Sequence, residues 1–516
     1  MKKMKKILSL LLASAMIFGC MSGMAFAAEE TTVAEKIAVE VDAELLKAGS
    51  IAVTEENMTE EQPLAAGTAD SSLFRIPAMI TLDNGDLLAA ADARWTTSAD
   101  WGGLDTIATV SSDNGKTWYY SFPIYFPDSN TKYPGMEVAT TAIDPVIVQG
   151  NDGTIYCIAD MNPSGITTGD IMPAYGTGYV QVDGEWRLAL TATYTKPNEN
   201  NAASYGNPAN YEYYVGDFDA EGFAHVLNMA DDTKTLWVVD EWYNIYKLDA
   251  ATNTYKALTQ TMVNDTTVIQ QNAFYKDSEL HVFNTGYLWM VTSTDNGRSW
   301  GNPTILNTQI KRASDRALLA SPGQGMVASN GDIIIPFYDH GDGQENASII
   351  WSSDNGKTWT RSNDVAGMWS SESEMVEIYD GVLRLFYRNG MGAICYADFT
   401  KTGDTWVAGT GVNTGIAVTS TCNVTAITHS QETNGKKVVM VACPGGSGRA
   451  NGKLFTFLVS EDNSMELFNT YSINTGNYAY SCMTEMNNGN IGLLWEDQAA
   501  AIRFDEIELD VVLGYK

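Results

Sequence analysis

An eight-residue segment that recurs along the chain constrains the fold more than any other feature. The pattern Ser-x-Asp-Asn-Gly-x-Thr/Ser-Trp occupies residues 111–118, 293–300 and 352–359, and a shortened, altered copy occupies 460–464. In such a segment the Ser and Asp side chains accept turn N–H groups, Gly takes a positive φ angle, and Trp anchors the turn by burial. We therefore interpret the repeats as structural turns between strands. Each copy has a single Asp, too few carboxylates for a calcium site.

The residues between the repeats are typical of β-hairpins. Short alternating runs are interrupted by Asn-Gly at 84–85, 330–331 and 488–489, and long amphipathic helical windows are scarce. Asp354 follows Asp295 by 59 residues, about the length of one four-stranded blade. We therefore expect an all-β chain built by radial repetition, a β-propeller.

One interval between repeats is too long for this arrangement. Asp295 follows Asp113 by 182 residues, and the excess falls in residues 164–273, which are rich in Tyr, Asn and Thr. We expect an inserted β domain or a long blade insertion there. The propeller would then be formed by residues 65–163 and 274–516.

The N-terminus has the features of a targeting segment. Four lysines fall within the first six residues, an apolar run follows from Ile7 to about Gly19, and Ala25-Phe26-Ala27 supplies a small-x-small cleavage signal. We predict a secretory signal peptide at residues 1–27, cleavage near Ala27 and secretion, with a lipoprotein anchored at Cys20 as a minor alternative. An acidic leader segment, 28–64, follows. No later run is long and apolar enough to span a bilayer.

Charge and residue counts exclude several classes of function. The chain has 63 acidic and 31 basic residues, and its net charge of −32 disfavours nucleic-acid binding and anionic membranes. Its four His are far apart, and no CxxC or HExxH spacing occurs, so we expect neither a metal nor another cofactor. Five Cys remain after residue 27, an odd and scattered set that does not indicate a disulfide framework.

Two hairpins place charged residues opposite one another. If Asn84-Gly85 is a two-residue turn, Arg75 faces Arg94, and two like charges across a strand pair are unfavourable unless an anion lies between them. The alternative is two splayed surface arginines.

In the second hairpin, a three-residue loop at 379–381 places Glu372 opposite Arg388, whereas a two-residue turn would put them on opposite faces. An ordinary cross-strand ion pair would explain this second pair equally well.

Several motifs in order resemble those of the bacterial sialidases of glycoside hydrolase family 33, in the subgroup with an inserted β domain. The repeats resemble the Asp box of that family. The other motifs are Phe74-Arg75-Ile76-Pro77, the segment 371–377 followed by Arg388, the segment 479–482, and the segment 491–496. The resemblance covers residues 65–516. It implies a six-bladed β-propeller and the cleavage of terminal sialic acids.

The resemblance also implies roles for individual residues. Three arginines would hold the substrate carboxylate, a fourth would lie near a ring hydroxyl, and a tyrosine would be the nucleophile. We expect these sites to be Arg75, Arg388 and Arg449 for the carboxylate, Arg94 for the hydroxyl, Tyr480 as nucleophile, Glu372 as its base, Asp100 as acid/base, and Glu496 to orient Arg75. Asp92 and Asp105 are the rivals of Asp100, and both are interpreted as structural residues of strands.

This set suits a sialoside chemically. Arginines form bidentate, charge-assisted hydrogen bonds with a carboxylate, and a neutral tyrosine nucleophile is not repelled by it. The resemblance therefore implies an exo-α-sialidase acting on sialylated glycans, glycoproteins or glycolipids, with retention through a tyrosyl–sialyl intermediate. The alternatives are an intramolecular trans-sialidase that releases an anhydro sialic acid and a non-catalytic sialoglycan-binding propeller. A propeller acting on uncharged sugars would not need three arginines.

Overall fold

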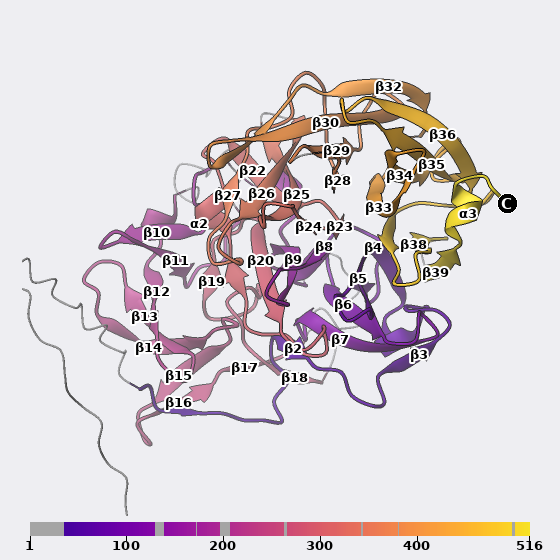
Figure 1. Ribbon diagram of the computed structural model, residues 1–516. Helices are drawn as coiled ribbons and strands as arrows, with labels where there is room; N and C mark the ends of the chain where they lie inside the picture. The colour runs from indigo at the N-terminus through magenta and orange to yellow at the C-terminus, as the bar shows by residue number, and fades with distance from the viewer. Residues whose placement is uncertain are drawn as a thin grey trace, which may run out of the picture.

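Figure 1 shows the computed structural model of the chain, in which residues 36–128, 139–171, 173–196, 207–262, 266–341, 344–379, 381–419, 421–497 and 501–516 are described. The predicted signal peptide at 1–27 and the alternative lipid anchor at Cys20 lie outside these residues. Within them, none of the helices has the length and apolar character needed to cross a membrane.

Strands form most of the described chain, and five sheets are arranged like the blades of a propeller around a common centre (Figure 1). The largest sheet contains β2 (Gly49–Ile51), β3 (Met58–Glu60), β4 (Leu73–Thr81), β5 (Leu87–Arg94), β6 (Leu104–Ser111), β7 (Thr117–Tyr125), β8 (Thr141–Gln149), β9 (Ile155–Asn162), β20 (Tyr287–Ser293), β21 (Thr304–Ile305) and β23 (Gly323–Gln324). The next two contain β22 (Asp315–Ala320), β24 (Met326–Val327), β25 (Ile333–Gly341), β26 (Gln344–Ser352) and β27 (Thr360–Arg361), and then β28 (Ser373–Glu377), β29 (Leu383–Tyr387), β30 (Ala393–Thr402), β31 (Thr405–Ala408) and β32 (Val412–Ala417). The last two contain β33 (Thr425–Thr433), β34 (Lys436–Pro444), β35 (Gly452–Val459) and β36 (Met465–Ser472), and then β37 (Ser481–Glu485), β38 (Ile491–Glu496) and β39 (Ile502–Ile507). The prediction of an all-β chain is confirmed.

The innermost strands of successive sheets lie side by side around the centre. Strand β28 lies against β33, β33 against β37, and β37 against β4. The last sheet of the propeller-like part therefore lies next to the first. Side chains of β37 bind the backbone of β4: the N–H of Met79 donates to Cys482 Sγ at 3.2 Å, and the N–H of Thr81 donates to Thr484 Oγ1 at 3.0 Å. The arrangement of sheets is therefore closed by polar contacts between β4 and β37.

A further sheet is formed by chain between β9 and β20, with one strand from the predicted leader. It contains β1 (Val39–Glu40), β10 (Tyr179–Val182), β11 (Glu185–Thr191), β12 (Tyr213–Phe218), β13 (Phe223–Asn228), β14 (Lys234–Asp240), β15 (Ile245–Asp249), β16 (Thr254–Ala257) and β19 (His281–Val282). The remaining short elements are β17 (Thr259–Thr261), β18 (Val268–Gln270), η1 (Thr68–Asp70), η2 (Thr168–Asp170), η3 (Pro208–Asn210), α2 (Asn307–Ile310) and α3 (Leu509–Val512). In Figure 1 this sheet lies to one side of the propeller-like part.

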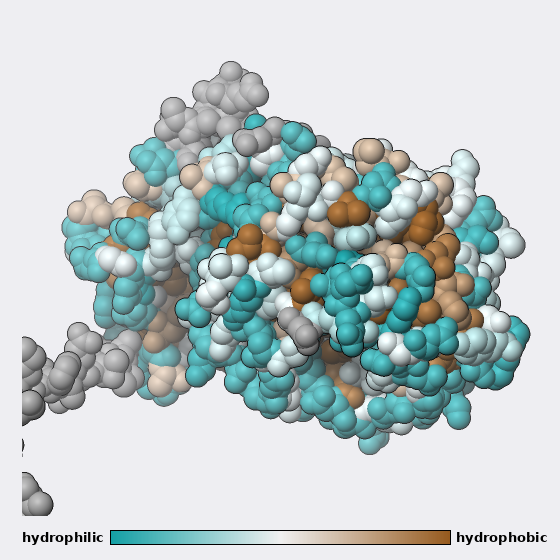
Figure 2. Space-filling model, turned by 45° about the horizontal axis from the view of Figure 1, so that its top comes forward, coloured by the Kyte–Doolittle hydropathy of each residue, from teal (hydrophilic) through white to brown (hydrophobic). Residues whose placement is uncertain are grey.

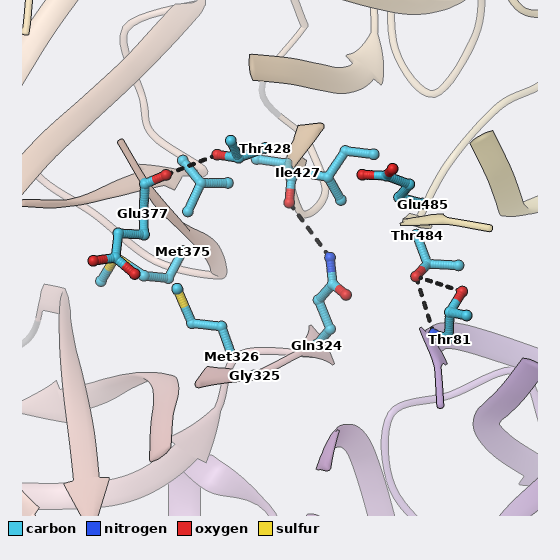
Figure 3. Close-up of a pocket in the computed structure, with 12 residues that line it drawn as sticks. Thr81, Gln324, Gly325, Met326, Met375, Glu377, Ile427, Thr428, Thr484 and Glu485 are labelled. Carbon is cyan, nitrogen blue, oxygen red and sulfur yellow. Dashed lines mark hydrogen bonds between the residues drawn. The ribbon is translucent and has the colours of Figure 1, made fainter. Parts of the chain in front are cut away.

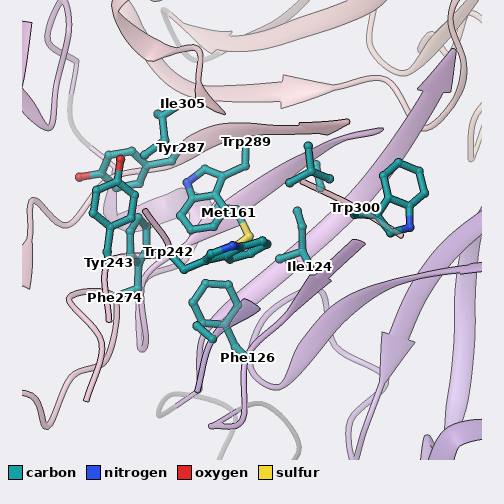
Figure 4. Packing of buried hydrophobic residues seen from close by; sticks show 14 of the residues in the cluster. Ile124, Phe126, Met161, Trp242, Tyr243, Phe274, Tyr287, Trp289, Trp300 and Ile305 are labelled. Carbon is teal, nitrogen blue, oxygen red and sulfur yellow. The ribbon is translucent and has the colours of Figure 1, made fainter. Parts of the chain in front are cut away.

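Buried aromatic side chains join the additional sheet to the propeller-like part. Trp242, Tyr243 and Phe274 come from the chain around that sheet. They pack against Trp289 of β20 and against Phe126, which directly follows β7 (Figure 4). The ring centroids of Phe274 and Trp289 are 5.0 Å apart, in an edge-to-face arrangement. On the face shown in Figure 2, by contrast, hydrophilic side chains predominate and the hydrophobic ones form small groups.

The repeated turns are structural, as predicted. In the copy at 352–359, Asp354 accepts the N–H and hydroxyl of Thr358 and the hydroxyl of Ser352, while Trp359 Nε1 donates to the Gly356 carbonyl at 3.1 Å. Slight burial would raise the pKa of Asp354, but these hydrogen bonds lower it to about 2. The Trp359 side chain is buried. The turn is thus held by one carboxylate and one buried ring.

Replacing Trp359 by Ala should lower the melting temperature without changing the geometry of the candidate site. The substitution removes a buried aromatic ring, which costs about 3–5 kcal/mol. Lys357→Ala, an exposed position in the same turn, is the matched control and should leave the melting temperature near that of the unmodified chain. Equal melting temperatures for both variants would contradict the structural interpretation of the repeat.

Candidate active site

The pairing of β4 with β5 differs from the predicted one. Arg75 is opposite Asp92, and Leu73 is opposite Arg94. Two irregularities shift the register: Ile76 has a φ angle of 59° at a β-bulge, and the turn at Asn84-Gly85 is longer than two residues, since Leu82 N–H donates to the Asp86 carbonyl. The prediction that two arginines face one another directly is therefore wrong, and a carboxylate is the cross-strand partner of Arg75.

Arg94 is fully buried beneath the loop that carries Asp100. Its guanidinium is 2.8 Å from Asp92 Oδ2 and 2.9 Å from Asp100 Oδ1, and it donates to the carbonyls of Ser98 and Ala99 at 2.9 Å each. All these contacts satisfy donors that burial would otherwise leave unpaired. No part of the Arg94 side chain is exposed, and its expected position beside a substrate hydroxyl stays a prediction.

Glu496 orients Arg75 from the other side. One Glu496 oxygen accepts the N–H of Ile76 at 2.7 Å and lies 3.3 Å from Arg75 Nε, while the other accepts from Arg75 Nη2 at 3.5 Å. Arg75 Nη1 also lies 3.4 Å from Asp100 Oδ1. Burial disfavours the guanidinium cation, but the nearby negative charges outweigh it and the pKa of Arg75 is raised. Arg75 is thus charged and held on two sides.

The register predicted for β28 and β29 is confirmed. Ser373 is opposite Tyr387, and one step further Arg388 N–H donates to the Glu372 carbonyl at 2.8 Å. Gly381 has a φ angle of 76°, the left-handed conformation expected of the last loop residue. The two side chains form an ion pair, with Arg388 Nη1 2.9 Å from Glu372 Oε2.

Tyr480 lies at the centre of this group. Its hydroxyl donates to Glu372 Oε1 at 2.5 Å and accepts from Arg388 Nη1 at 3.4 Å. The guanidinium carbons of Arg75 and Arg449 lie 5.4 and 5.2 Å from the centre of its ring. Glu496, the last residue of β38, is next to Tyr480, because its N–H donates to the Tyr480 carbonyl at 3.0 Å.

The ionisation of Tyr480 is opposed by its surroundings. Burial and the charge of Glu372 raise the pKa of this phenol well above its usual range, although Arg388 acts in the other direction. The hydroxyl is therefore neutral when the site is empty, with a hydrogen-bonded carboxylate positioned to accept its proton.

A cavity of about 420 Å³ opens beside these residues. Its lining includes Arg75, Ser98, Arg449, Ala479 and Glu496. Arg449 is exposed and donates to the Thr421 carbonyl at 3.0 Å, and 64% of the Asp100 side chain is exposed. Two of the predicted cations, Arg75 and Arg449, therefore line this cavity, and the predicted acid Asp100 contacts Arg75.

Sequence reasoning missed two acidic residues in this region, Asp144 and Asp160. Asp144 has a φ angle of 60°, and its N–H donates to Asp92 Oδ1 at 3.0 Å; Asp160 accepts the N–H of Ala320 at 2.8 Å. Burial, supported by the charge of Asp92, raises the pKa of both carboxyls well above the usual range. The available signal was an Asp within each of two otherwise apolar strands, β8 and β9.

Comparison with known proteins gives a consistent set of relatives. Residues 254–493 match the family described as BNR repeat-like domain. The chain is 28% identical over 518 residues to the anhydrosialidase of Macrobdella decora, covering 92% of this chain and 64% of the relative. It is 29% identical over 481 residues to sialidase B of Streptococcus pneumoniae, covering 87% of this chain and 65% of the relative. The chain thus spans slightly less than two thirds of the length of these curated relatives.

Solved structures agree in fold. The intramolecular trans-sialidase of Ruminococcus gnavus, in complex with oseltamivir carboxylate, has a TM-score of 0.76 and 28% identity, covering 88% of this chain and 98% of that one. The NanB sialidase of Streptococcus pneumoniae has a TM-score of 0.75 and 26% identity, covering 88% and 71%. Each of these two structures therefore matches nearly nine tenths of this chain.

An ultraviolet titration should show that Tyr480 remains protonated at high pH. An ordinary tyrosine is half ionised at about pH 10, whereas the pKa of Tyr480 is raised, so its phenolate should appear only above that pH. The difference between the phenolate absorbance of the unmodified chain and that of Tyr480→Phe isolates this one residue. A difference signal that rises to completion below pH 10 would show that the phenol is not held neutral by Glu372 and burial.

Proposed function

We propose that this chain, which is similar to sialidases in sequence and in fold, is an exo-α-sialidase that hydrolyses terminal sialic acid from glycoconjugates. One observation carries the proposal: Tyr480 donates to Glu372 at 2.5 Å while the guanidinium groups of Arg75, Arg388 and Arg449 surround it. A neutral nucleophile with its base attached, ringed by cations, suits attack on a carbon that bears a carboxylate.

In the proposed complex, three arginines bind the sialic acid carboxylate. Arg388 and Arg449 have exposed parts, and Arg75 lines the cavity. Planar guanidinium groups form paired, charge-assisted hydrogen bonds with carboxylates. The carboxylate would replace Asp100 as a partner of Arg75, which frees Asp100 to face the leaving group.

The proposed reaction proceeds in two steps. Tyr480 Oη forms a bond with the anomeric carbon as its proton passes to Glu372, while the bond from that carbon to the leaving oxygen breaks and Asp100 protonates that oxygen. Asp100 then removes a proton from water, which attacks the same carbon and releases Tyr480, and Glu372 returns its proton to the phenolate. Two displacements at one carbon retain its configuration. No metal or other cofactor takes part in these steps.

Arg94 receives a different role in this proposal from the one the sequence suggested. Because Arg94 is buried and bonded to Ser98, Ala99 and Asp100, it positions the loop of the acid/base. Asp92 holds the Arg94 guanidinium from the other side, 2.8 Å away. The substrate contacts are left to the other three arginines.

The architecture and location belong to the same proposal. We take the largest sheet to be two blades joined at the single pair Leu104↔Thr141, which would give six blades in all, with an insertion over 164–273. Sialylated glycans, glycoproteins or glycolipids would be the substrates. The signal peptide at 1–27 would direct the chain to the outside of the cell.

A second candidate, intramolecular trans-sialylation, is supported by the named relatives. One is an anhydrosialidase and another an intramolecular trans-sialidase. In that reaction a hydroxyl of the bound sialic acid, rather than water, attacks the anomeric carbon and gives an anhydro sugar. A fluorogenic sialoside assay with identification of the released sugar separates the two, and absence of any release would overturn both.

Tyr480→Phe should reduce turnover by several orders of magnitude while the fold persists. The ring packing is kept, but the oxygen that forms the covalent bond is lost. A fluorinated sialic acid that traps the tyrosyl intermediate should label the unmodified chain and not the variant, as seen by intact mass. Near-normal turnover in this variant would show that another residue is the nucleophile.

Arg388→Ala should raise KM and also lower turnover. Arg388 would bind the carboxylate in both the ground state and the transition state, and it also holds Glu372 at 2.9 Å. Steady-state kinetics with the same sialoside measure both constants. Arg384→Ala, a buried arginine that pairs with Asp398 in the same sheet, is a control for loss of an ion pair alone and should change stability without raising KM.

A further inference from the structure

The open edge of β37 is bonded by side chains instead of a neighbouring strand. Strand β37 pairs with β38 along one edge only. Alternate backbone groups, those of Ser481 and Met483, point to the other edge, toward β33. A backbone group without a partner would be costly at this buried position, and each of the four groups finds one.

Asn423 binds the backbone next to Tyr480 at two points. Its Nδ2 donates to the Ser481 carbonyl at 3.0 Å, and its Oδ1 accepts the Ser481 N–H at 3.3 Å. The same amide donates to the Pro322 carbonyl at 3.4 Å, and the residue is 1% exposed. The side chain thus takes the place of a paired strand residue, and both bonds fix the orientation of its amide.

The same arrangement recurs two residues further from the site. Thr425 Oγ1 accepts the Met483 N–H at 3.0 Å, and Gln324 Nε2 donates to the Met483 carbonyl at 2.9 Å. Figure 3 shows Gln324 extending from β23 into a pocket that is also lined by Thr484, where its Nε2 donates to the Ala426 carbonyl at 3.5 Å. This second pair of bonds is matched in kind to the first but more distant from Tyr480.

Glu374 connects this edge to β28, which Glu372 directly precedes. Its oxygens accept from Thr425 Oγ1 at 2.6 Å, from the Ala426 N–H at 2.6 Å and from Cys482 Sγ at 3.3 Å. The Glu374–Cys482 contact repeats the Glu372–Tyr480 contact two residues along both strands. Strands β28, β33 and β37 are therefore held at fixed relative positions near Tyr480.

We propose that Asn423 is a positioning residue for Tyr480. The two hydrogen bonds of Asn423 to the Ser481 backbone keep the Tyr480 hydroxyl within hydrogen-bonding distance of Glu372. The inference rests on the proposed function, since Tyr480 is taken as the nucleophile. The Tyr480 hydroxyl is in direct contact with Glu372, so a backbone shift at residue 481 would change the distance between the two groups. A misplacement of about 1 Å at a reacting group can cost about 100-fold in rate.

Asn423→Ala removes both bonds to Ser481 and should act on the chemical step. We expect kcat for a fluorogenic sialoside, and the maximal rate of covalent labelling by the fluorinated sialic acid, to fall about 10- to 100-fold. KM should stay within about threefold, because the arginines that would bind the carboxylate are untouched. Gln324→Met is the matched control: it removes the bond to Met483 and should lower the melting temperature with kcat retained.

Asn423→Asp provides a test that does not depend on the Ala variant folding. The introduced carboxyl keeps the acceptor for the Ser481 N–H, but it can donate to the Ser481 carbonyl only when protonated. Turnover relative to the unmodified chain should therefore rise as the pH falls through the pKa of that carboxyl. A structural role alone would not produce this recovery.

The outcomes are separable. Labelling of Asn423→Ala at the unmodified rate, a pH-independent Asn423→Asp, or an equal loss of kcat in Gln324→Met would each overturn the positioning role. If the unmodified chain releases no sialic acid and is not labelled, the proposed function fails instead, and the positioning role fails with it.

Discussion

The innermost strand of a blade has one edge without a neighbouring strand. The geometry of the site depends on which groups form hydrogen bonds with the backbone N–H and C=O groups at that edge. In β37, Asn423 before β33, Thr425 of β33 and Gln324 of β23 bond to the open edge through their side chains, while β4 makes the contacts that close the ring. Tyr480 precedes β37 directly, and Glu372 precedes β28 in the same way. The distance between the two functional groups is therefore set by contacts between strands of different sheets, and only indirectly by either hairpin.

This division explains what the sequence could and could not predict. The pairing of Glu372 with Arg388 was predictable, because a local loop ending at Gly381 sets the register over a few residues. The pairing of Arg75 was not, because a bulge at Ile76 and a longer turn each add a residue that no local signal counts. The predictions of the all-β class and of the structural role of the repeats each rest on several copies of a pattern. An error in the register of one hairpin therefore does not change them.

The residues that sequence reasoning missed share a physical cause. Asn423 acts on a backbone 58 residues away, and Asp144 meets Asp92 from a distance of 52 residues. Neither residue lies in a motif, and an isolated Asn or Asp within a buried segment has many possible partners. Arg94 illustrates a related point: a resemblance supplies an expected role for a residue, but only the packing shows which groups its donors already contact.

The electrostatics of the site follow from burial as much as from composition. Arg75, Arg388 and Arg449 bring three cations around Tyr480 in a chain of net charge −32. Burial raises the pKa of Asp144 and Asp160, which favours their neutral forms. Glu372 and Glu496 are each paired with an arginine. The acids near these arginines are therefore either paired with an arginine or have a raised pKa that favours the neutral form. This is how a site in an acidic chain can bind an anionic ligand.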